Sequence, residues 1–179
     1  MKWTTEQRID MSKPHWRRAH APDLPAIGTI AARIHPDLPE RLDVLAEKVL
    51  LYPDGCRVLA AENEIVGYGL SHPWMQHQIP PLDGFLERLP DKSDCLYLHD
   101  VAVLPDFRGG GVARAYVATI EGHARSSGIA TLALVSVYAT RPLWEHLGFR
   151  AVAADPPLSA KLASYGANAT YMLRDLACM

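Results

Sequence analysis

A strand-forming run that passes through three consecutive glycines into a helical pattern constrains the fold more than any other segment of this chain. Residues 95–104 read CLYLHDVAVL, and glycines fill positions 109–111 after a short turn. Apolar residues then recur with helical spacing over residues 112–124. Glycines leave backbone N–H groups uncovered, and a helix N-terminus is electropositive, so this turn, with Arg108 beside it, is suited to bind a phosphate. The structural alternative is that the glycines only make a tight connection between strand and helix.

The remaining patterns predict one α/β domain. Helices are expected over residues 22–34, 42–50 and 141–146, and further strands over residues 57–61, 65–70, 131–137, 149–153 and 170–174. The run 131–137 is uninterrupted and apolar, which is typical of a central strand buried on both faces. The expected order of elements along the chain is one strand, two helices, a β-hairpin and then strand, helix, strand, helix and two strands. It predicts a mixed, mostly antiparallel sheet with helices on both faces.

Two segments fall outside this pattern. Residues 1–14 are polar and are expected to form an N-terminal extension, with Trp3 frayed or docked, so the domain covers residues 15–179. Residues 73–94 are proline-rich and irregular, and such a stretch is far longer than an ordinary loop. Long loops are more often functional or mobile than inert, so this one is a candidate part of the site.

The amino-acid composition excludes several classes of protein. With 179 residues, 18 Lys+Arg against 20 Asp+Glu, a net charge of −2 and 49% hydrophobic residues, the chain is expected to be an ordinary globular domain that does not bind nucleic acid. Three widely spaced cysteines suggest neither a disulfide framework nor a zinc site, and no run approaches the roughly 18 apolar residues of a membrane span. The expectation is a soluble cytoplasmic protein without a metal.

The spacing of the glycine turn narrows its ligand. It lacks the Lys-Ser/Thr pair of a P-loop, and Arg114 stands where the dinucleotide fingerprint needs its third glycine. Arg108-x-x-Gly111-x-Ala113, directly after a Val-Ala-Val strand, resembles the turn of the GCN5-related N-acetyltransferases (GNAT). Residues 142–149, PLWEHLGF, are similar to the Leu-Tyr-x-x-x-Gly-Phe segment of that family. The resemblance covers roughly residues 15–177.

Within that superfamily, the sequence resembles most the arylalkylamine (serotonin-type) N-acetyltransferases and their bacterial relatives. His99 stands four residues before Val103, as one of the two catalytic histidines of these enzymes does. The segment from Ala133-Leu134 to Gly148-Phe149 aligns without a gap. Tyr97 occupies the place of the other histidine.

The resemblance implies acetyl-CoA as co-substrate. The main chain of Val101 and Val103 would pair with the pantetheine arm like an added strand, and the N–H groups of residues 109–114 would hold the pyrophosphate. A bulge near residues 101–103 would splay the strand and free an N–H group for an oxyanion. The residues assigned to the cofactor are Val101, Ala102, Val103, Arg108, Gly109, Gly110, Gly111, Val112, Ala113, Arg114 and Trp144.

His99 is the candidate base or water relay for direct attack through a ternary complex. An alkylamine with a pKa near 10 is mostly protonated at neutral pH, whereas an imidazole titrates near 6.5. Strand alternation places His99 on one face with Tyr97, Val101 and Val103 unless a bulge intervenes, and Asp100 on the opposite face, where a structural role is expected. The structural alternative is that His99 is a strand residue whose ring nitrogens are hydrogen-bonded within the fold and take no part in catalysis.

The departing thiolate needs a proton donor or hydrogen bonds. Trp144 replaces the tyrosine that the family uses as general acid, and an indole N–H does not lose its proton near pH 7. Trp144 is therefore expected to pack. Tyr97 or Tyr138 is the candidate acid, and otherwise the thiolate leaves with the help of hydrogen bonds alone.

The acceptor is expected to lie between residues 34–40 and residues 73–94. His35, Pro36, Trp74 and Phe85 are the candidate substrate-binding residues, although the two aromatic side chains fit a local core equally well. The leading hypothesis is an N-acetyltransferase, monomeric or homodimeric, that acts on a small amine. The alternatives are acetylation of a protein N-terminus or lysine, and a CoA-binding protein without catalysis. A plain interaction domain would not explain the glycine turn.

Overall fold

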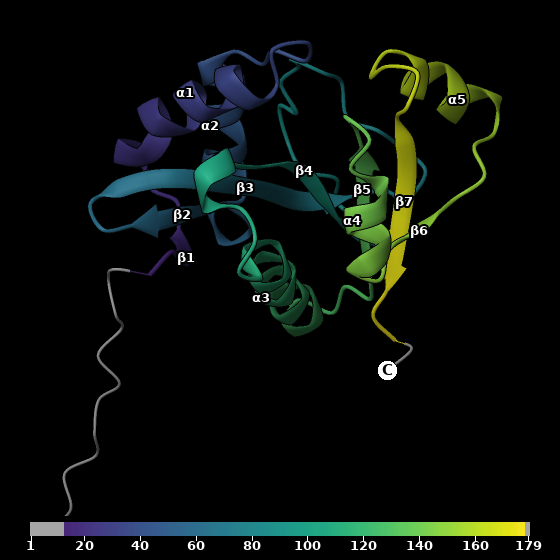
Figure 1. Cartoon of the computed structure of the whole chain (residues 1–179). Coiled ribbons are helices and arrows are strands. Elements are labelled where there is room, and N and C mark those ends of the chain that lie inside the picture. The colour runs from purple at the N-terminus through teal and green to yellow at the C-terminus, as the bar shows by residue number, and fades with distance from the viewer. Residues whose placement is uncertain (1–12, 178–179) are drawn as a thin grey trace, which may run out of the picture.

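The computed structural model describes residues 13–177, and within them seven strands form one sheet in the order β1-β2-β3-β4-β5-β7-β6 (Figure 1). The strands are β1 (His15–Arg18), β2 (Arg57–Ala61), β3 (Glu64–Trp74), β4 (Cys95–Val103), β5 (Thr131–Ser136), β6 (Arg150–Ala151) and β7 (Thr170–Asp175). The helices are α1 (Leu24–Ile34), α2 (Leu42–Leu51), α3 (Val112–Ser126), α4 (Arg141–His146) and α5 (Pro156–Ala163). The β4–β5 pair is parallel and the other pairs are antiparallel, so the expected mixed sheet is confirmed.

The boundaries differ from the expected ones at three places. Strand β3 continues to Trp74, because its last four residues pair with the first four of β4. Strand β6 has only two residues, where five were expected. Helix α5 was not expected, although the sequence holds its start signal: Asp155 caps it by accepting a hydrogen bond from the Leu158 N–H, and prolines fill its first turn.

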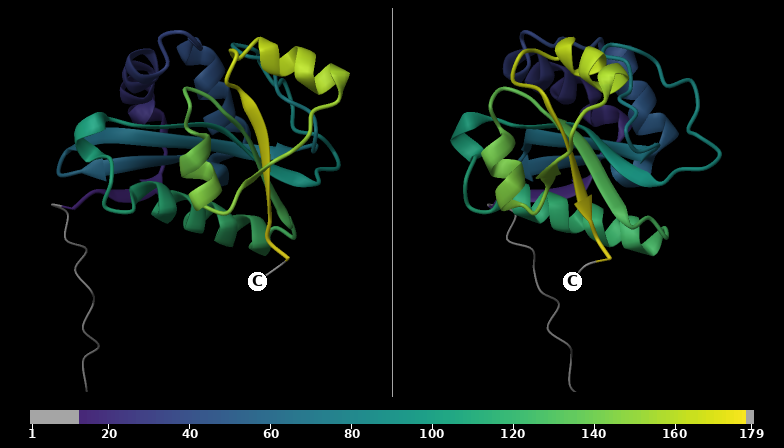
Figure 2. Two further views of the ribbon diagram at one scale, coloured as in Figure 1. Left: turned by 45° about the vertical axis from the view of Figure 1, so that its right-hand side comes forward. Right: turned by 90° about the vertical axis from the view of Figure 1, so that its right-hand side faces the viewer.

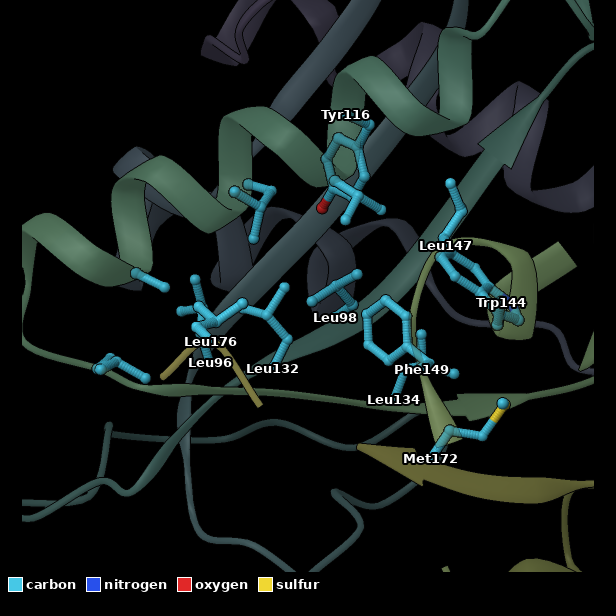
Figure 3. Close-up of a cluster of buried hydrophobic side chains, with 14 residues drawn as sticks. Leu96, Leu98, Tyr116, Leu132, Leu134, Trp144, Leu147, Phe149, Met172 and Leu176 are labelled. Atoms are coloured by element: carbon cyan, nitrogen blue, oxygen red, sulfur yellow. The ribbon is translucent and has the colours of Figure 1, made fainter. Parts of the chain in front are cut away.

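The helices cover both faces of the sheet (Figures 1 and 2). Helices α1 and α2 pack on one face over β2, β3 and β4, and α5 covers the same face farther along, where Leu158 packs against Tyr97 and Tyr171. Helices α3 and α4 pack on the other face, and their core includes Tyr116, Trp144 and Phe149 (Figure 3). Apolar side chains thus hold both layers against the sheet.

The centre of the sheet is open at one end. Strands β4 and β5 pair only where Leu96–Leu98 meets Leu132–Leu134. Beyond Leu98, the edge of β4 that faces β5 has no strand partner in the described part of the chain. Unpaired strand edges offer N–H and C=O groups to a ligand. This is the splay that the resemblance implies for the cofactor strand.

A bulge in β4 lies at His99 rather than near residues 101–103. Leu70 on β3 pairs with Asp100, and the next residue, Ser71, pairs with Leu98, so His99 is the extra residue. A bulge shifts the alternation of side chains by one position. Asp100 therefore shares a face with His99 and Tyr97, toward α1 and α2, and the expectation that it lies on the opposite face is wrong.

Residues 1–12, 178 and 179 lie outside the described part of the chain. Trp3, Cys178 and most of the expected N-terminal extension are among these residues. Among the described residues, Cys56 and Cys95 are buried free thiols. None of the described helices has the length and apolar character needed to cross a membrane.

Candidate active site

A cleft of about 640 Å³ runs from the glycine turn, along the free edge of β4, to the loop between α1 and α2. Many of the residues expected to form the site line it, together with others. The lining residues in the expected set are His35, Tyr97, His99, Val101, Ala102, Val103, Arg108, Gly109, Gly111, Val112, Ala113, Arg114, Tyr138 and Trp144. The structure thus brings the expected cofactor segment and the expected catalytic residues to one cavity.

The glycine turn is open toward the solvent side. Gly109, Gly110 and Gly111 have φ angles of 81°, 55° and 80°, which L side chains rarely adopt, and a Cβ at any of them would meet no atom within 4 Å. Gly111 caps α3, whose first N–H groups have no partner within the helix. Arg108 donates from Nε to the Val103 carbonyl at 2.9 Å, which fixes the turn to the end of β4. Gly110 does not line the cleft.

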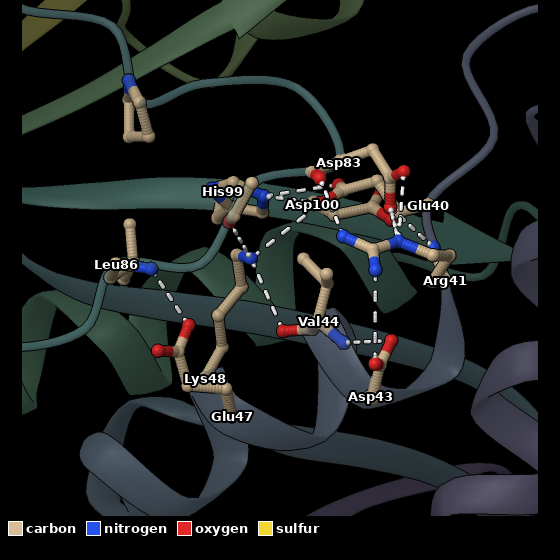
Figure 4. A network of polar contacts seen from close by, with 12 residues as sticks. Glu40, Arg41, Asp43, Val44, Glu47, Lys48, Asp83, Leu86, His99 and Asp100 are labelled. Carbon is tan, nitrogen blue, oxygen red and sulfur yellow. Dashed lines mark hydrogen bonds and ion pairs between the residues drawn. The ribbon is translucent and has the colours of Figure 1, made fainter.

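His99 and Glu40 meet at the other end of the cleft (Figure 4). The Nε2 atom of His99 lies 3.0 Å from Oε1 of Glu40 and 3.3 Å from Oε2, and the histidine side chain is 3% exposed. Lys48, fully buried on α2, places its Nζ 3.5 Å from Oε2 of the same carboxylate. Glu40 comes from the α1–α2 loop, so tertiary folding, not strand spacing, brings it to His99.

A second histidine–carboxylate pair lies on the same face. Nε2 of His35 is 2.8 Å from Oδ1 of Asp100, and the hydroxyl of Tyr68 donates to the other oxygen of that carboxylate. Burial opposes the charged form of both groups, but the hydrogen bond and the charge of the partner outweigh it. The pKa of His35 is therefore raised and that of Asp100 is lowered. The ring of Tyr138 stacks on His35 with centroids 5.6 Å apart.

The two tyrosines that the sequence nominates as acids both keep their protons. Burial raises the pKa of Tyr97 well above its ordinary value, and burial also raises that of Tyr138, although 43% of Tyr138 is exposed. Trp144 is 9% exposed and packs edge-on against Phe149, and its indole N–H donates to Oγ1 of Thr140 at 3.2 Å. Trp144 thus belongs to the core while also forming part of the cleft wall.

Three of the expected substrate residues do not reach this cleft. Pro36 is exposed at the end of α1. Trp74 packs edge-on against His72, with ring centroids 5.2 Å apart, because β3 extends far enough to carry it into the sheet. Phe85 is 44% exposed and lies 5.4 Å below the guanidinium of Arg41.

Other residues take their place at the acceptor end. Ile34, Leu38 and Glu40 from the expected segment 34–40 and Leu82 from residues 73–94 close the cleft there, together with Asp100 and Tyr165, which were not expected at the acceptor. A helical pattern over residues 156–163 was the signal that could have pointed to Tyr165, which lies just after α5. No local pattern points to Glu40. Among the described residues, no group of three or more His, Cys, Asp or Glu side chains is arranged to hold a metal ion.

Comparisons with known proteins give the family. The model of the Acetyltransferase (GNAT) family matches residues 15–149, which is most of the chain, so the chain belongs to this family. As a member of it, the chain is an acetyltransferase. Among curated proteins, no sequence matches the chain significantly.

Solved structures share the fold at low sequence identity. N-acetylglutamate synthase from Neisseria gonorrhoeae, in complex with coenzyme A and N-acetyl-glutamate, is 20% identical with a TM-score of 0.69. The match covers 91% of this chain but 35% of that one, so this chain spans about a third of its length. The ribosomal-protein-S18-alanine N-acetyltransferase from Escherichia coli is 19% identical, with a TM-score of 0.63 over 91% and 94% of the two chains. The loading GNATL domain of CurA from Lyngbya majuscula is 14% identical, with a TM-score of 0.74 over 93% and 99%.

Proposed function

We propose that this acetyltransferase transfers the acetyl group directly to the primary amine of a small arylalkylamine, with His99 as the base or water relay. One observation carries the proposal: His99 lies on the wall of the same cleft as the free edge of β4 and the open glycine turn. Acetyl-CoA, held by that edge and turn, would present its thioester beside the acceptor. Direct attack then needs only a ternary complex and no acetyl-enzyme.

The acceptor end of the cleft supports an aromatic amine rather than an amino acid. Leu38, Leu82 and Tyr165 give it apolar and aromatic walls beside the Tyr138–His35 stack, and the carboxylates of Glu40 and Asp100 also line it. Of the residues described there, none is a Lys or Arg open to the cleft, because Lys48 is fully buried behind Glu40. An acceptor carboxylate would therefore find no lysine or arginine partner there, whereas a flat apolar ring would find contacts.

The proton balance assigns roles to the cleft's own residues. The acceptor reaches the cleft mostly as an ammonium ion, and His99 would remove its proton before or during the attack. The new C–N bond forms as the C–S bond breaks, and the thiolate takes a proton. Tyr97 and Tyr138 are the two candidate donors, since both retain the hydroxyl hydrogen at neutral pH.

A second candidate function follows from a smaller hollow beside the cleft. About 360 Å³ in volume, it lies against the loop after α5 and shares Leu38, Tyr138 and Tyr165 with the cleft. A peptide whose N-terminal amine entered the cleft would place its following residue there. This arrangement favours N-terminal acetylation of a peptide as the alternative acceptor class.

The test is thiol release from acetyl-CoA with a panel of tryptamine, phenethylamine, polyamines, aminoglycosides and short peptides. The variants are His99→Ala and a matched control, His123→Ala. His123 lies on α3 and does not line the cleft. Release confined to the arylalkylamines, lost in His99→Ala and kept in His123→Ala, supports the proposal. Release with peptides alone would favour the second candidate. Acetyl-CoA binding without release on any amine would point to a CoA-binding protein.

A further inference from the structure

Glu40 connects the α1–α2 loop to β4 and α2. It stands in the loop between α1 and α2, yet its carboxylate side chain is only 8% exposed. It contacts His99 on the bulge of β4 and Lys48 on α2 (Figure 4). Lys48 is held in turn, because its Nζ donates to the carbonyls of Val44 and Gly84 at 3.2 and 3.4 Å. A carboxylate buried in this way is fixed in position by the groups around it.

This contact determines which nitrogen of His99 carries the hydrogen. A carboxylate only accepts hydrogen bonds, so Nε2 of His99 must donate to Glu40. A neutral imidazole carries one N–H, so Nδ1 is then left with its lone pair. Within the described part of the chain, Nδ1 of His99 is buried and has no hydrogen-bond partner. It is thus the nitrogen of His99 that is free to accept a proton.

We propose that Glu40 is a positioning residue for acetyl transfer, which holds His99 with its hydrogen on Nε2 so that Nδ1 accepts the proton of the acceptor amine. The proposal rests on the proposed function. In the step, the amine nitrogen forms the C–N bond to the acetyl carbonyl carbon, its proton passes to Nδ1, and the C–S bond breaks to release the thiolate. The resulting imidazolium keeps its hydrogen bond to Glu40, and its extra proton later returns to solvent or to the thiolate.

The groups around His99 make this role specific to Glu40. Titratable and charged side chains near His99 come from the α1–α2 loop, α2, β3 and β4. They are Glu40, Lys48, His72, Tyr97 and Asp100. Within residues 13–177, only Glu40 forms a hydrogen bond with the ring of His99. His72 lies with its ring centroid 5.6 Å from that of His99 and donates from Nδ1 to the carbonyl of Pro73 instead.

The experiment compares Glu40→Gln with the matched control Asp83→Asn. Asp83 forms hydrogen bonds with Arg41, the residue that follows Glu40 in the chain, but it has no contact with His99. The Asp83→Asn variant therefore reports on the structure of the loop alone. We expect Glu40→Gln to lower kcat for the best amine by roughly 10-fold to 100-fold, part of the roughly 10²–10⁴ that a general base contributes. KM for acetyl-CoA should stay within about twofold. Asp83→Asn should behave like the wild type.

A merely structural role would not confine the loss to kcat, so the split between kcat and KM for acetyl-CoA is the readout. An unchanged kcat in Glu40→Gln would overturn the inference.

Nitrogen NMR on ¹⁵N-histidine-labelled protein tests the same inference without activity and without a variant. In its neutral form, the ring of His99 should show a protonated Nε2 and an unprotonated Nδ1. A protonated Nδ1 in the wild type would reject the inference. Failure of the proposed function is distinguishable: no thiol release by the wild type on any amine rejects both, whereas wild-type release with an unaffected Glu40→Gln rejects this inference alone.

Discussion

Two histidine–carboxylate pairs face one cleft, and the electrostatics of the His35–Asp100 pair can be measured. In the His35–Asp100 pair, the histidine pKa is raised above 6.5 and the carboxyl pKa is lowered below 3.8. The contribution of His35 to stability is fully present below pH 6.5 and is lost as pH rises through its raised pKa. The contribution of Asp100 is present above pH 3.8 and is lost on acidification. The pair therefore stabilises the fold most between about pH 4 and pH 6.5.

Replacing His35 tests this window. The free energy of unfolding lost in His35→Gln should be largest near pH 6 and should shrink toward pH 9, on top of a constant loss from the stack with Tyr138. His123→Gln is the contrast, because burial lowers the pKa of His123 and the sign is reversed. In that variant, the wild-type advantage should shrink as pH falls. Chemical denaturation across this pH range measures both, and a pH-independent loss in His35→Gln would contradict the pairing.

The buried charge of Lys48 should contribute to stability through its pair with Glu40. Its ammonium is fully buried against Glu40, and a broken buried pair leaves one charge without compensation. Lys48→Met should lower the free energy of unfolding by about 3 kcal/mol. The exposed Lys92 provides the control, since Lys92→Met should change stability by less than about 0.5 kcal/mol. Equal effects of the two substitutions in urea denaturation would show that Lys48 is not paired as described.

At the scale of elements, the strand–turn–helix unit was predictable and its bulge was not. The glycine turn, α3, α4 and the buried strand β5 each follow from local periodicity and turn residues. The bulge depends on how β3 and β4 pair, which no spacing within residues 95–103 reveals. For this reason, Asp100 was placed on the opposite face from His99. Glu40 was missed as an individual residue for a related reason, because its partner is 59 residues away.

The turn itself offers a matched pair of glycines. Gly111 begins α3 and Gly128 follows its end, both with positive φ and both with open space around a built Cβ. Alanine at either position should cost a similar amount of stability, about 1–2 kcal/mol from the left-handed backbone. Only Gly111 lines the cleft, so Gly111→Ala alone should raise KM for acetyl-CoA. Steady-state kinetics decides this, and an equal KM effect in Gly128→Ala would count against a phosphate site in the turn.

The molecule as a whole consists of two half-sheets that meet along a short seam. Only three residue pairs join β4 to β5, and the cleft begins where they end. A ligand that lies in this opening contacts both halves, so it should stabilise the folded state as a unit. Coenzyme A at about 100 times its Kd should add about 2.7 kcal/mol to the free energy of unfolding.

This prediction is measurable by thermal unfolding. The added stability corresponds to a rise in Tm of roughly 5–10 °C for a domain of this size. In Gly111→Ala at the same coenzyme A concentration, the rise should be smaller. A wild-type Tm that does not respond to saturating coenzyme A would show that the cleft does not bind it.

Family and architecture were accessible from the sequence because they depend on local patterns that recur along the whole chain. The cofactor end of the cleft depends on one contiguous segment, and most of the residues expected there line it. The acceptor end is assembled from loops distant in sequence, and there Trp74 and Phe85 were expected whereas Leu38, Leu82 and Tyr165 are present. Acceptor specificity is for this reason the property that the sequence defines least.

The most direct test of the account is the rate of thiol release from acetyl-CoA with phenethylamine, measured for the wild type and for His99→Ala under the same conditions. We expect robust release by the wild type and a loss in kcat of about 100-fold or more in the variant, with KM for acetyl-CoA nearly unchanged. Equal rates for the two proteins would contradict the role of His99, and no release by the wild type with any arylalkylamine would contradict the proposed acceptor.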